Sequence, residues 1–252
     1  MTSASRIKVA LAGYTGKVGR ELARVFEAEP EIDYVGGFGR GTAIGGFLAE
    51  HRPTVLVDFT HPSVGLEHAL AAVAAGAAPV IGTSGIPAEG VDRLEAACKQ
   101  AGLGGIVAPN FALGAVLMMH LAELAAPFFD AVEVIEMHHA AKIDAPSGTA
   151  LATARRLAKA RGGRGFAYNR PEKVTLEAAR GGEEGGVAVH SVRLPGLVAD
   201  QEVVFGLPGQ TLTIAHRTTS REAYAPGVLL ALRRVTAEPR FYRGLEALLG
   251  LV

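Results

Sequence analysis

The sequence predicts a doubly wound parallel α/β sheet followed by a second, α+β domain with a mixed or antiparallel sheet. In the first half, short continuous apolar runs alternate with helical patterns, which is typical of parallel strands covered by helices on both faces. In the second half, alternating apolar and polar positions replace the continuous runs, as in strands with one buried face. Crossovers between parallel strands are right-handed, so we expect the first half to form an open sheet.

Five strands and three helices are predicted in the first half. The helix after the first strand has apolar Val18, Leu22 and Phe26 on one face, and Pro30 ends it. The other elements follow from the same alternation of apolar runs and helical patterns. The strands are expected at 7–12, 32–38, 55–59, 79–82 and 105–108, and the helices at 16–28, 61–76 and 87–102.

The second half changes to an α+β pattern, in which Leu207–Gln210 has the composition of a hairpin turn. We therefore expect a first domain over 1–110, a second domain over 111–219, and a C-terminal segment over 220–252 that packs back on the first domain. Residues 161–173 are the most loop-like stretch. Helices are expected at 111–125, 147–160 and 220–235, and strands at 131–139, 186–194, 201–207 and 210–218.

The composition excludes several classes of protein. The 252 residues include 25 Lys or Arg and 25 Asp or Glu, so no global basic field exists to hold nucleic acid or an anionic membrane. The single cysteine, Cys98, excludes an intramolecular disulfide and a cysteine-based zinc site, and we expect a reducing cytoplasmic setting. The uncharged stretch Ala69–Ile86 is mostly alanine and glycine and contains Pro79, which predicts a helix end, a turn and a strand rather than a membrane span.

The first predicted strand leads directly into a glycine-rich turn with Gly13, Gly16 and Gly19. Glycine lets the backbone turn tightly and approach a pyrophosphate, and the following helix N-terminus offers free N–H groups. This strand–turn–helix context predicts a Rossmann-like dinucleotide site. The spacing GxxGxxG differs from the usual GxGxxG, so a purely structural turn is the alternative.

The end of the second strand bears on which dinucleotide is bound. A site that prefers NAD places Asp or Glu there, on the ribose 2′-hydroxyl. Here Gly39 and Arg40 follow the strand, Asp33 lies too early, and Lys17 stands in the glycine turn. Two cations without a carboxylate favour a 2′-phosphate and therefore NADPH, with NADH used less well. The alternative is that Arg40 is an ordinary surface arginine.

Two further loops follow predicted strand ends, at 82–85 and 108–111. In a doubly wound sheet, ligands bind beyond the carboxyl ends of the strands. We therefore expect both loops to face the nicotinamide half of the cofactor, although each has the composition of a plain turn.

A dense polar cluster spans 136–150, between a predicted strand and a predicted helix. Ser147 is a good helix N-cap, and Gly148 and Thr149 would expose N–H groups at the helix start. Such a helix start suits a carboxylate. His138, His139 and Lys142 add cationic and proton-donating groups to the same cluster. Metal ligation by the two histidines is the weaker alternative, because adjacent residues of a strand point to opposite faces, and a capped surface turn is another.

The cluster resembles the signature E-x-H-H-x-x-K-x-D-x-P-S-G-T-A of the 4-hydroxy-tetrahydrodipicolinate reductase family, which is also called the dihydrodipicolinate reductase family. The glycine turn, the loops at 82–85 and 108–111, and the segments 57–62, 194–206 and 216–222 also match, so the resemblance covers nearly the whole chain. It implies a two-domain, cytoplasmic homotetramer that reduces a cyclic imine dicarboxylate with NAD(P)H in diaminopimelate and lysine biosynthesis. The domain over 1–110 would then bind the dinucleotide, and the domain over 111–219 would bind the substrate and form the oligomer.

The resemblance also implies residue roles. His138 would donate and accept a proton and Lys142 would donate one, and the substrate carboxylates would contact His139, Ser147, Gly148 and Thr149. No metal is implied. The implied cofactor contacts are Gly13, Tyr14, Thr15, Gly16, Lys17, Val18, Arg40, Gly82, Thr83, Ser84, Ala108, Pro109, Asn110 and Phe111.

Two features depart from the family pattern. Family members often carry an acidic residue where Gly39 stands, so efficient use of NADH is in doubt. The segment between Arg40 and Pro53 is also short, which would reduce the wall on the adenine side.

Two other functions compete with this interpretation. A semialdehyde dehydrogenase would need a cysteine nucleophile at the domain junction, whereas Cys98 lies in a predicted helix of the cofactor half. A non-catalytic NADP-sensing module could share the fold, but a sensor needs no proton donor.

Overall fold

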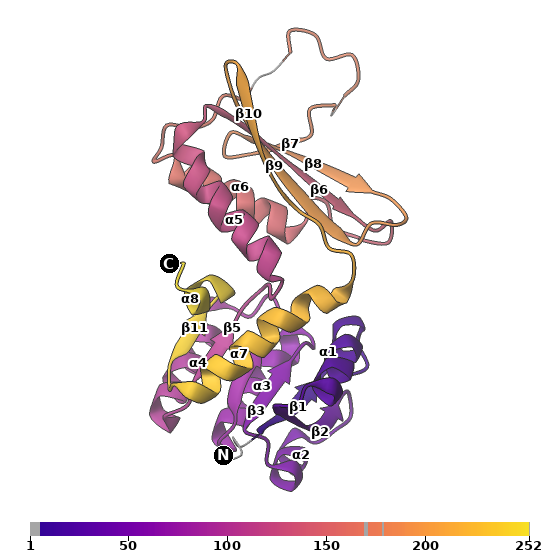
Figure 1. Ribbon diagram of the computed structural model, residues 1–252, viewed down its shortest axis with the longest axis vertical. Helices are drawn as coiled ribbons and strands as arrows, with labels where there is room; N and C mark the ends of the chain where they lie inside the picture. Colours follow the sequence, from indigo (N-terminus) through magenta and orange to yellow (C-terminus); the bar gives the residue numbers. More distant parts are fainter. Residues whose placement is uncertain (1–5, 169–170, 178, 252) are drawn as a thin grey trace. The chain divides into compact units, whose positions relative to one another are not determined.

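The computed structural model describes residues 6–168, 171–177 and 179–251. The chain forms two compact units and passes between them twice, at Leu113–Gly114 and at Ser220–Arg221 (Figure 1). The first unit therefore contains both ends of the described chain, and the second is a single continuous segment.

The first unit is built on a six-stranded parallel sheet, in the order β11-β5-β4-β3-β1-β2. After β1, the chain adds β2 on one side and then β3, β4 and β5 on the other, so the direction of strand order reverses between β1 and β3. Folds of this kind bind ligands beyond the carboxyl ends of the strands at such a switch point. The strands are β1 (Ile7–Ala12), β2 (Ile32–Phe38), β3 (Val55–Asp58), β4 (Ala78–Ile81), β5 (Gly105–Val107) and β11 (Phe241–Arg243).

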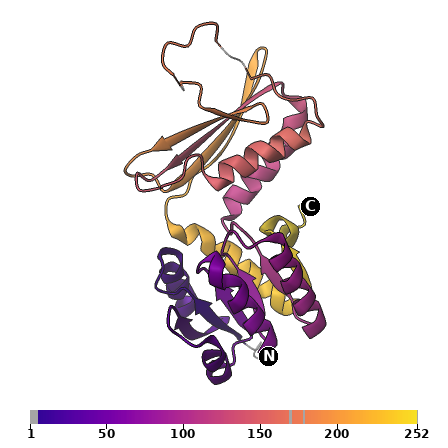
Figure 2. The same cartoon turned by 180° about the vertical axis from the view of Figure 1, so that it is seen from behind.

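Helices cover both faces of this sheet. Helices α1 and α7 lie on one face, and α2, α3 and α4 lie on the other (Figures 1 and 2). Helix α1 buries Leu22 and Phe26, as its apolar pattern predicted, and α4 ends at Gly102 in the left-handed conformation. The helices are α1 (Lys17–Ala28), α2 (Ile44–His51), α3 (Pro62–Ala74), α4 (Ala88–Ala101), α7 (Ala225–Ala237) and α8 (Leu245–Leu249).

Several short elements were not predicted. Helix α2 contains two glycines in eight residues and therefore has a weak helical pattern, and α8 has five residues. Strand β11 has three residues and pairs with β5, which makes the sheet one strand wider than expected. The predicted helix at 220–235 is instead a 3-10 turn at Arg221–Tyr224 followed by α7.

The second unit is a five-stranded mixed sheet in the order β10-β9-β6-β8-β7, with β6 and β8 parallel and the other pairs antiparallel. Two helices, α5 (Leu113–Ala125) and α6 (Gly148–Ala160), pack on one face of the sheet (Figures 1 and 2). The strands are β6 (Ala131–His138), β7 (Gly182–Glu184), β8 (Val187–Arg193), β9 (Ala199–Leu207) and β10 (Gln210–His216).

The core of this unit follows from the alternating pattern of its strands. Val132 and Val134 of β6 and Val203 and Phe205 of β9 point to the helices and are buried. The predicted hairpin joins β9 and β10, and Gly209 in its turn has φ +78°. The parallel register places Glu136 opposite Ser191 and His138 opposite Arg193, which brings an arginine far along the chain beside the polar cluster.

Candidate active site

The glycine turn lies at the switch point of the parallel sheet. Gly13 has φ +82°, and a Cβ there would lie 2.8 Å from the carbonyl oxygen of Phe59, in the loop after β3. A Cβ on Gly19 would lie 2.1 Å from the carbonyl oxygen of Gly13. Side chains at these positions would push the turn, the β3 loop and helix α1 apart, so the glycines are required for the close packing itself.

Helix α1 begins at this turn, and its N-terminus can receive an anion. No described side chain caps the helix at Gly16, and its first turn contains no acidic residue. The N-terminal N–H groups and the helix dipole therefore remain available to a phosphate. Tyr14, Thr15 and Lys17 are exposed around it. The turn thus fits the pyrophosphate of a dinucleotide, both in backbone shape and in charge.

The end of β2 has the open space that a ribose phosphate needs. Arg40 is exposed and forms no ion pair or side-chain hydrogen bond with any residue that the structure describes, and the same holds for Lys17. A Cβ added to Gly39 would meet no atom within 4 Å. These two cations are therefore available to a ligand, and position 39 has room for a side chain.

A buried carboxylate holds the loops after β3 and β4 together. Asp58 is fully buried, and its Oδ1 accepts hydrogen bonds from the Thr60 backbone N–H at 2.9 Å and from the Thr60 and Thr83 hydroxyls at 2.7 Å. Its Oδ2 lies 2.7 Å from Nδ1 of His68 on α3. Burial would raise the pKa of Asp58, but these hydrogen bonds, led by that of His68, hold it below the ordinary 3.8.

The two remaining loops of the predicted cofactor site lie at the same edge of the sheet, beyond β4 and β5. A Cβ on Gly82 would lie 2.3 Å from the ring of Phe59, so this loop also needs glycine. Phe111 and Ala108 are fully buried, so these residues offer a ligand only their backbone. The Asn110 side chain accepts a hydrogen bond from the Ala112 N–H at 2.9 Å, which shapes the second loop.

In the second unit, the polar cluster is organised around Glu136. This residue is fully buried at the end of β6, and its Oε2 lies 2.5 Å from Nδ1 of His138. Both terminal nitrogens of Arg193 donate to Glu136 at 2.8 Å, and the Ser147 N–H donates at 3.1 Å. Burial would raise the pKa of Glu136, but hydrogen bonds from Arg193, Ser191 and His138 hold it below the ordinary 4.5.

The start of helix α6 lies beside these groups. Ser147 is the N-cap, and its hydroxyl accepts the Ala150 N–H at 3.1 Å, as predicted. Gly148 is exposed and Thr149 is half-buried, so the first turn faces outward. Lys142 lies on the loop before the helix, and its Nζ donates to both oxygens of Asp144 at 2.8 and 2.9 Å. His138, Ser147 and Lys142 are thus brought to one end of β6, and His139 follows directly along the chain.

Sequence reasoning missed Arg193, Asp58 and Thr60, and it gave no role to Glu136. Arg193 reaches the cluster only through the pairing of β6 with β8, which no local pattern reveals. Asp58 and Thr60 stand in the segment that resembles the family, and the signal that could have found them is an acidic residue at the end of an otherwise apolar strand.

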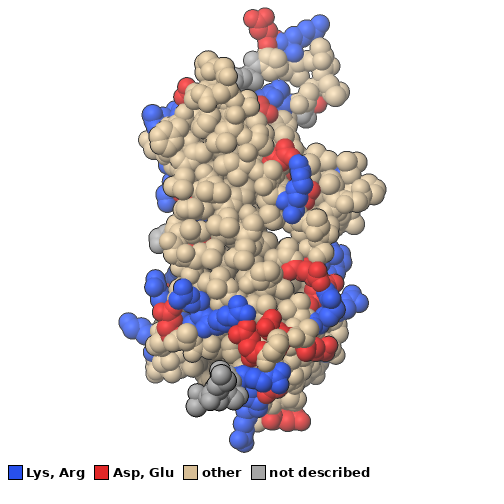
Figure 3. All heavy atoms as spheres, in the orientation of Figure 1, with Lys and Arg blue, Asp and Glu red and all other residues tan. Residues whose placement is uncertain are grey.

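Other features of the described residues bear on the alternatives. Cys98 is fully buried on α4, and burial raises the pKa of its thiol to about 11, so it is no candidate for a nucleophile. Among the described residues, no group of three or more His, Cys, Asp or Glu could hold a metal ion, and no helix is long and apolar enough to cross a membrane. Positive and negative side chains are interspersed on the face in Figure 3.

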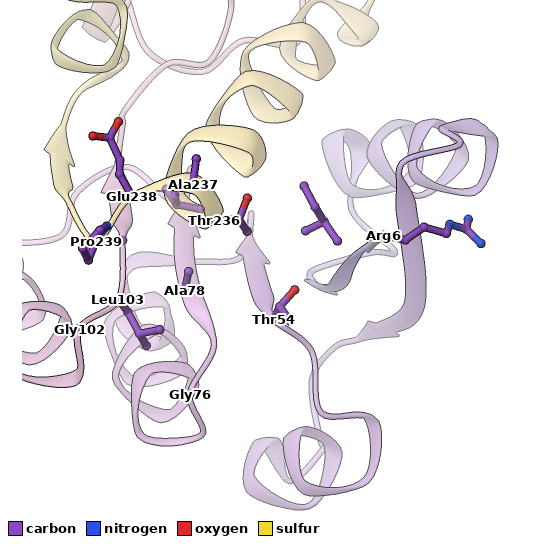
Figure 4. A pocket seen from close by; sticks show the side chains of 13 residues that line it. Arg6, Thr54, Gly76, Ala78, Gly102, Leu103, Thr236, Ala237, Glu238 and Pro239 are labelled. Carbon is purple, nitrogen blue, oxygen red and sulfur yellow. The ribbon is translucent and has the colours of Figure 1, made fainter. Parts of the chain in front are cut away.

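A cavity of about 540 Å³ lies in the first unit, at the opposite edge of the sheet from the glycine turn (Figure 4). The amino ends of β1, β3 and β4 and the carboxyl ends of α3, α4 and α7 surround it, with Arg6 and Glu238 among the lining residues. None of the predicted site residues lines it. The cavity is therefore separate from the predicted cofactor site, which lies with the glycine turn at the carboxyl ends of the strands.

A doubly wound sheet with a glycine turn fitted to a pyrophosphate, and a second unit with a histidine, a lysine and an open helix start, define a nicotinamide-dependent oxidoreductase of two domains. Comparisons with known proteins identify the family. Residues 7–111 match the family model "Dihydrodipicolinate reductase, N-terminus", and residues 114–249 match "Dihydrodipicolinate reductase, C-terminus". The chain belongs to the dihydrodipicolinate reductase family, also named 4-hydroxy-tetrahydrodipicolinate reductase.

Similar proteins extend over the full chain. The 4-hydroxy-tetrahydrodipicolinate reductase of Moorella thermoacetica is 47% identical, covering 96% of this chain and 98% of that protein. The enzyme of the same name from Dehalococcoides mccartyi strain BAV1 is 43% identical, covering 97% and 99%. The structure of dipicolinate-bound dihydrodipicolinate reductase from Paenisporosarcina sp. TG-14 has a TM-score of 0.87 at 36% identity, covering 96% and 99%.

These findings confirm the predicted family and fold class. The predicted function, NAD(P)H-dependent reduction of 4-hydroxy-tetrahydrodipicolinate in lysine and diaminopimelate biosynthesis, is confirmed as well by the full-length relatives of that name. The amine dehydrogenase of Mycobacterium smegmatis, with a TM-score of 0.63 at 14% identity, shares only the fold.

Proposed function

We propose that this protein reduces 4-hydroxy-tetrahydrodipicolinate to tetrahydrodipicolinate and prefers NADPH as the reductant. The net change is the gain of a hydride and a proton and the loss of water. The observation that carries the proposal is the grouping of His138, Lys142 and the open N-terminus of α6 at the end of β6. This grouping supplies a proton donor beside a site for carboxylates, which reduction of an unsaturated dicarboxylate requires.

The carboxylates of the substrate bind at the start of α6. The N–H groups of Gly148 and Thr149 point out of the first helical turn, and Ser147 fixes that turn by capping it. His139 and the Lys142 ammonium add contacts to a second carboxylate. The similar reductase from Paenisporosarcina sp. TG-14 is bound to dipicolinate, a planar dicarboxylate of similar size, which supports this assignment.

The proton is delivered by His138 and Lys142. Addition of a hydride to the conjugated system builds negative charge on the substrate, and a positioned acid must neutralise it. His138 is held at Nδ1 by Glu136, which leaves Nε2 as its reactive nitrogen. Lys142 is held by Asp144 until a substrate carboxylate competes for it.

The dinucleotide binds at the carboxyl edge of the parallel sheet and, when bound, supplies the hydride. The glycine turn from Gly13 to Val18 receives the pyrophosphate, and the loops at 82–84 and 108–111 bind the nicotinamide half. Arg40 and Lys17 are the free cations for a 2′-phosphate, and position 39 holds no carboxylate. These two features support the preference for NADPH.

We propose that the second unit also carries the oligomerisation surface of a homotetramer, as the family resemblance implied. Helix α5 and the turn after it expose Leu117, Leu121, Leu124 and Phe128 at helical spacing, and Phe128 is 75% exposed. An exposed apolar stripe of this kind supports a contact between subunits. Light scattering after size exclusion measures the mass, and a monomer at micromolar concentration contradicts the proposal. Cytoplasmic localisation stays a prediction.

The deciding experiment follows NADPH oxidation at 340 nm while a dihydrodipicolinate synthase generates the substrate in the same cuvette, and repeats it with NADH. We expect turnover with both, with the larger kcat/KM for NADPH. Omission of the synthase is the control, and it must abolish the signal. Tight binding of NADPH without turnover would contradict the reductase and favour an NADP-sensing module.

A further inference from the structure

We propose that Glu136, held by Arg193, is the positioning residue that sets both the catalytic histidine and the carboxylate-binding helix of this site. The inference rests on the proposed function of His138 and of α6, and it assigns a role to two residues that touch neither substrate nor cofactor in that proposal. Four hydrogen bonds of one buried carboxylate carry it.

The first consequence concerns the orientation of His138. Glu136 is fully buried and ionised, so its oxygens only accept hydrogen bonds. The short contact of 2.5 Å from its Oε2 therefore requires a proton on Nδ1 of His138. Fixing that proton on Nδ1 leaves Nε2 as the nitrogen that exchanges a proton with the substrate. The imidazole side chain is only 14% exposed, so its ring position is also confined.

The second consequence concerns helix α6. The other oxygen of Glu136, Oε1, accepts the N–H of Ser147 at 3.1 Å, and Ser147 is the N-cap of the helix. The same carboxylate therefore fixes the distance between the histidine and the helix N-terminus. Proton delivery and carboxylate binding both tolerate only errors well below 1 Å. Because one carboxylate holds both His138 and the start of α6, their relative position is fixed.

Arg193 completes the arrangement from a different strand. Its two terminal nitrogens bind the two oxygens of Glu136 at 2.8 Å, which is the bidentate geometry that holds a carboxylate in one orientation. One of them also donates to the backbone oxygen of Asp144 at 2.6 Å, and Asp144 holds Lys142. Arg193 thus links the loop that carries Lys142 to the carboxylate that holds His138.

The test compares Glu136→Gln with a matched control, Glu133→Gln. Glu133 lies three residues earlier on β6 and also binds an arginine and a histidine, Arg180 and His190, but none of these belongs to the proposed site. We expect Glu136→Gln to lower kcat on the order of 100-fold and to weaken binding of dipicolinate several-fold. NADPH binding stays within twofold of wild type, because every proposed cofactor contact lies in the other unit. Glu133→Gln keeps kcat within about twofold, and equal losses in the two variants would overturn the proposal.

A double variant separates positioning from folding, because Glu136→Gln leaves the half-buried Arg193 guanidinium without its carboxylate partner. Glu136→Gln combined with Arg193→Gln removes both charges, so we expect thermal stability to recover toward wild type. We expect kcat of the double variant to stay low, because it still lacks the carboxylate that holds His138 and Ser147. Recovery of kcat together with stability would mean that the pair is merely structural.

Nitrogen-15 NMR of the histidine rings reads the tautomer directly, with His138→Gln assigning the signals of that residue. In wild type, we expect the neutral ring to carry its proton on Nδ1, and in Glu136→Gln we expect a shift toward the Nε2 form. An unchanged tautomer overturns the proposal. This measurement needs no turnover, so it stands even if wild type fails to reduce the substrate, a result that would instead overturn the proposed function.

Discussion

At the scale of single residues, the proposed preference for NADPH depends on the absence of a side-chain carboxylate at Gly39. A carboxylate at this strand end would accept the ribose 2′-hydroxyl of NADH and repel the 2′-phosphate of NADPH. Because a Cβ here meets no atom within 4 Å, a glutamate can be introduced without displacing the backbone. The position therefore isolates an electrostatic effect from a steric one.

We expect Gly39→Glu to lower the ratio of kcat/KM for NADPH to that for NADH by about tenfold or more, since one charge-assisted contact is worth ~1.5–3 kcal/mol. Initial rates with both cofactors measure it. Gly39→Ala is the matched control, because it adds a Cβ without charge, and its ratio should equal that of wild type. The same ratio in all three proteins would show that this loop does not hold the ribose.

Lys142 is the second residue whose role one substitution can test. Its ammonium contacts both oxygens of Asp144, which fixes its position on the loop before α6. We expect Lys142→Ala to lower kcat by roughly 100-fold or more while leaving the dissociation constant of NADPH unchanged. Lys159→Ala, at the exposed far end of α6, serves as the control and should retain full activity. Normal turnover of Lys142→Ala would remove the lysine from the mechanism.

At the scale of elements, Asp58 ties the ends of β3 and β4 to α3. The carboxylate accepts from Thr60, Thr83 and His68, so it shapes the loop after β3 and the proposed cofactor loop after β4 at once. Its pKa is lower in the folded protein than its ordinary 3.8. The ionised form therefore favours folding above pH 3.8, and this contribution is lost as the pH falls through the lower folded value.

We expect Asp58→Asn to lower the thermal midpoint by several degrees at pH 7 and to weaken NADPH binding, because a neutral amide cannot accept the same set of hydrogen bonds. The difference from wild type should shrink as the pH falls below 3.8, where the contribution of the ionised Asp58 is lost. Thermal melts at a series of pH values measure it. A difference that disappears already near pH 6 would assign the effect to another group.

Elements with a strong local pattern could be predicted, and contacts made by strand pairing could not. The apolar face of α1 and the serine cap of α6 each follow from residues that lie close together in the sequence, and both occur where expected. Helix α2 and strand β11 were missed because each is stabilised mainly by packing against the sheet rather than by its own propensity. Arg193 was missed for a related reason, since its partner Glu136 lies 57 residues away.

At the scale of the whole molecule, the order of segments along the chain differs from their grouping in space. The chain leaves the first unit after Leu113 and returns at Arg221, so the first unit is completed only when its last segment has packed. Helix α7 buries Val228, Leu232 and Val235 there. A Cβ on Gly227 would lie 2.1 Å from the backbone oxygen of Phe111, so this helix fits closely beside the loop after β5.

Truncation after Ser220 tests this dependence. Burial of the three large side chains of α7 stabilises the first unit by ~1.5–3 kcal/mol each, a total comparable to the whole stability of a typical domain. We therefore expect the truncated chain to lose NADPH binding and to leave the first unit open to proteolysis. The second unit is a continuous segment with its own core, so a protected fragment close to 114–220 should survive digestion and show a cooperative melt. If the truncated chain still bound NADPH, the remaining five strands would form a stable cofactor-binding sheet without α7 and β11. The returning segment would then not be needed to complete the cofactor-binding fold.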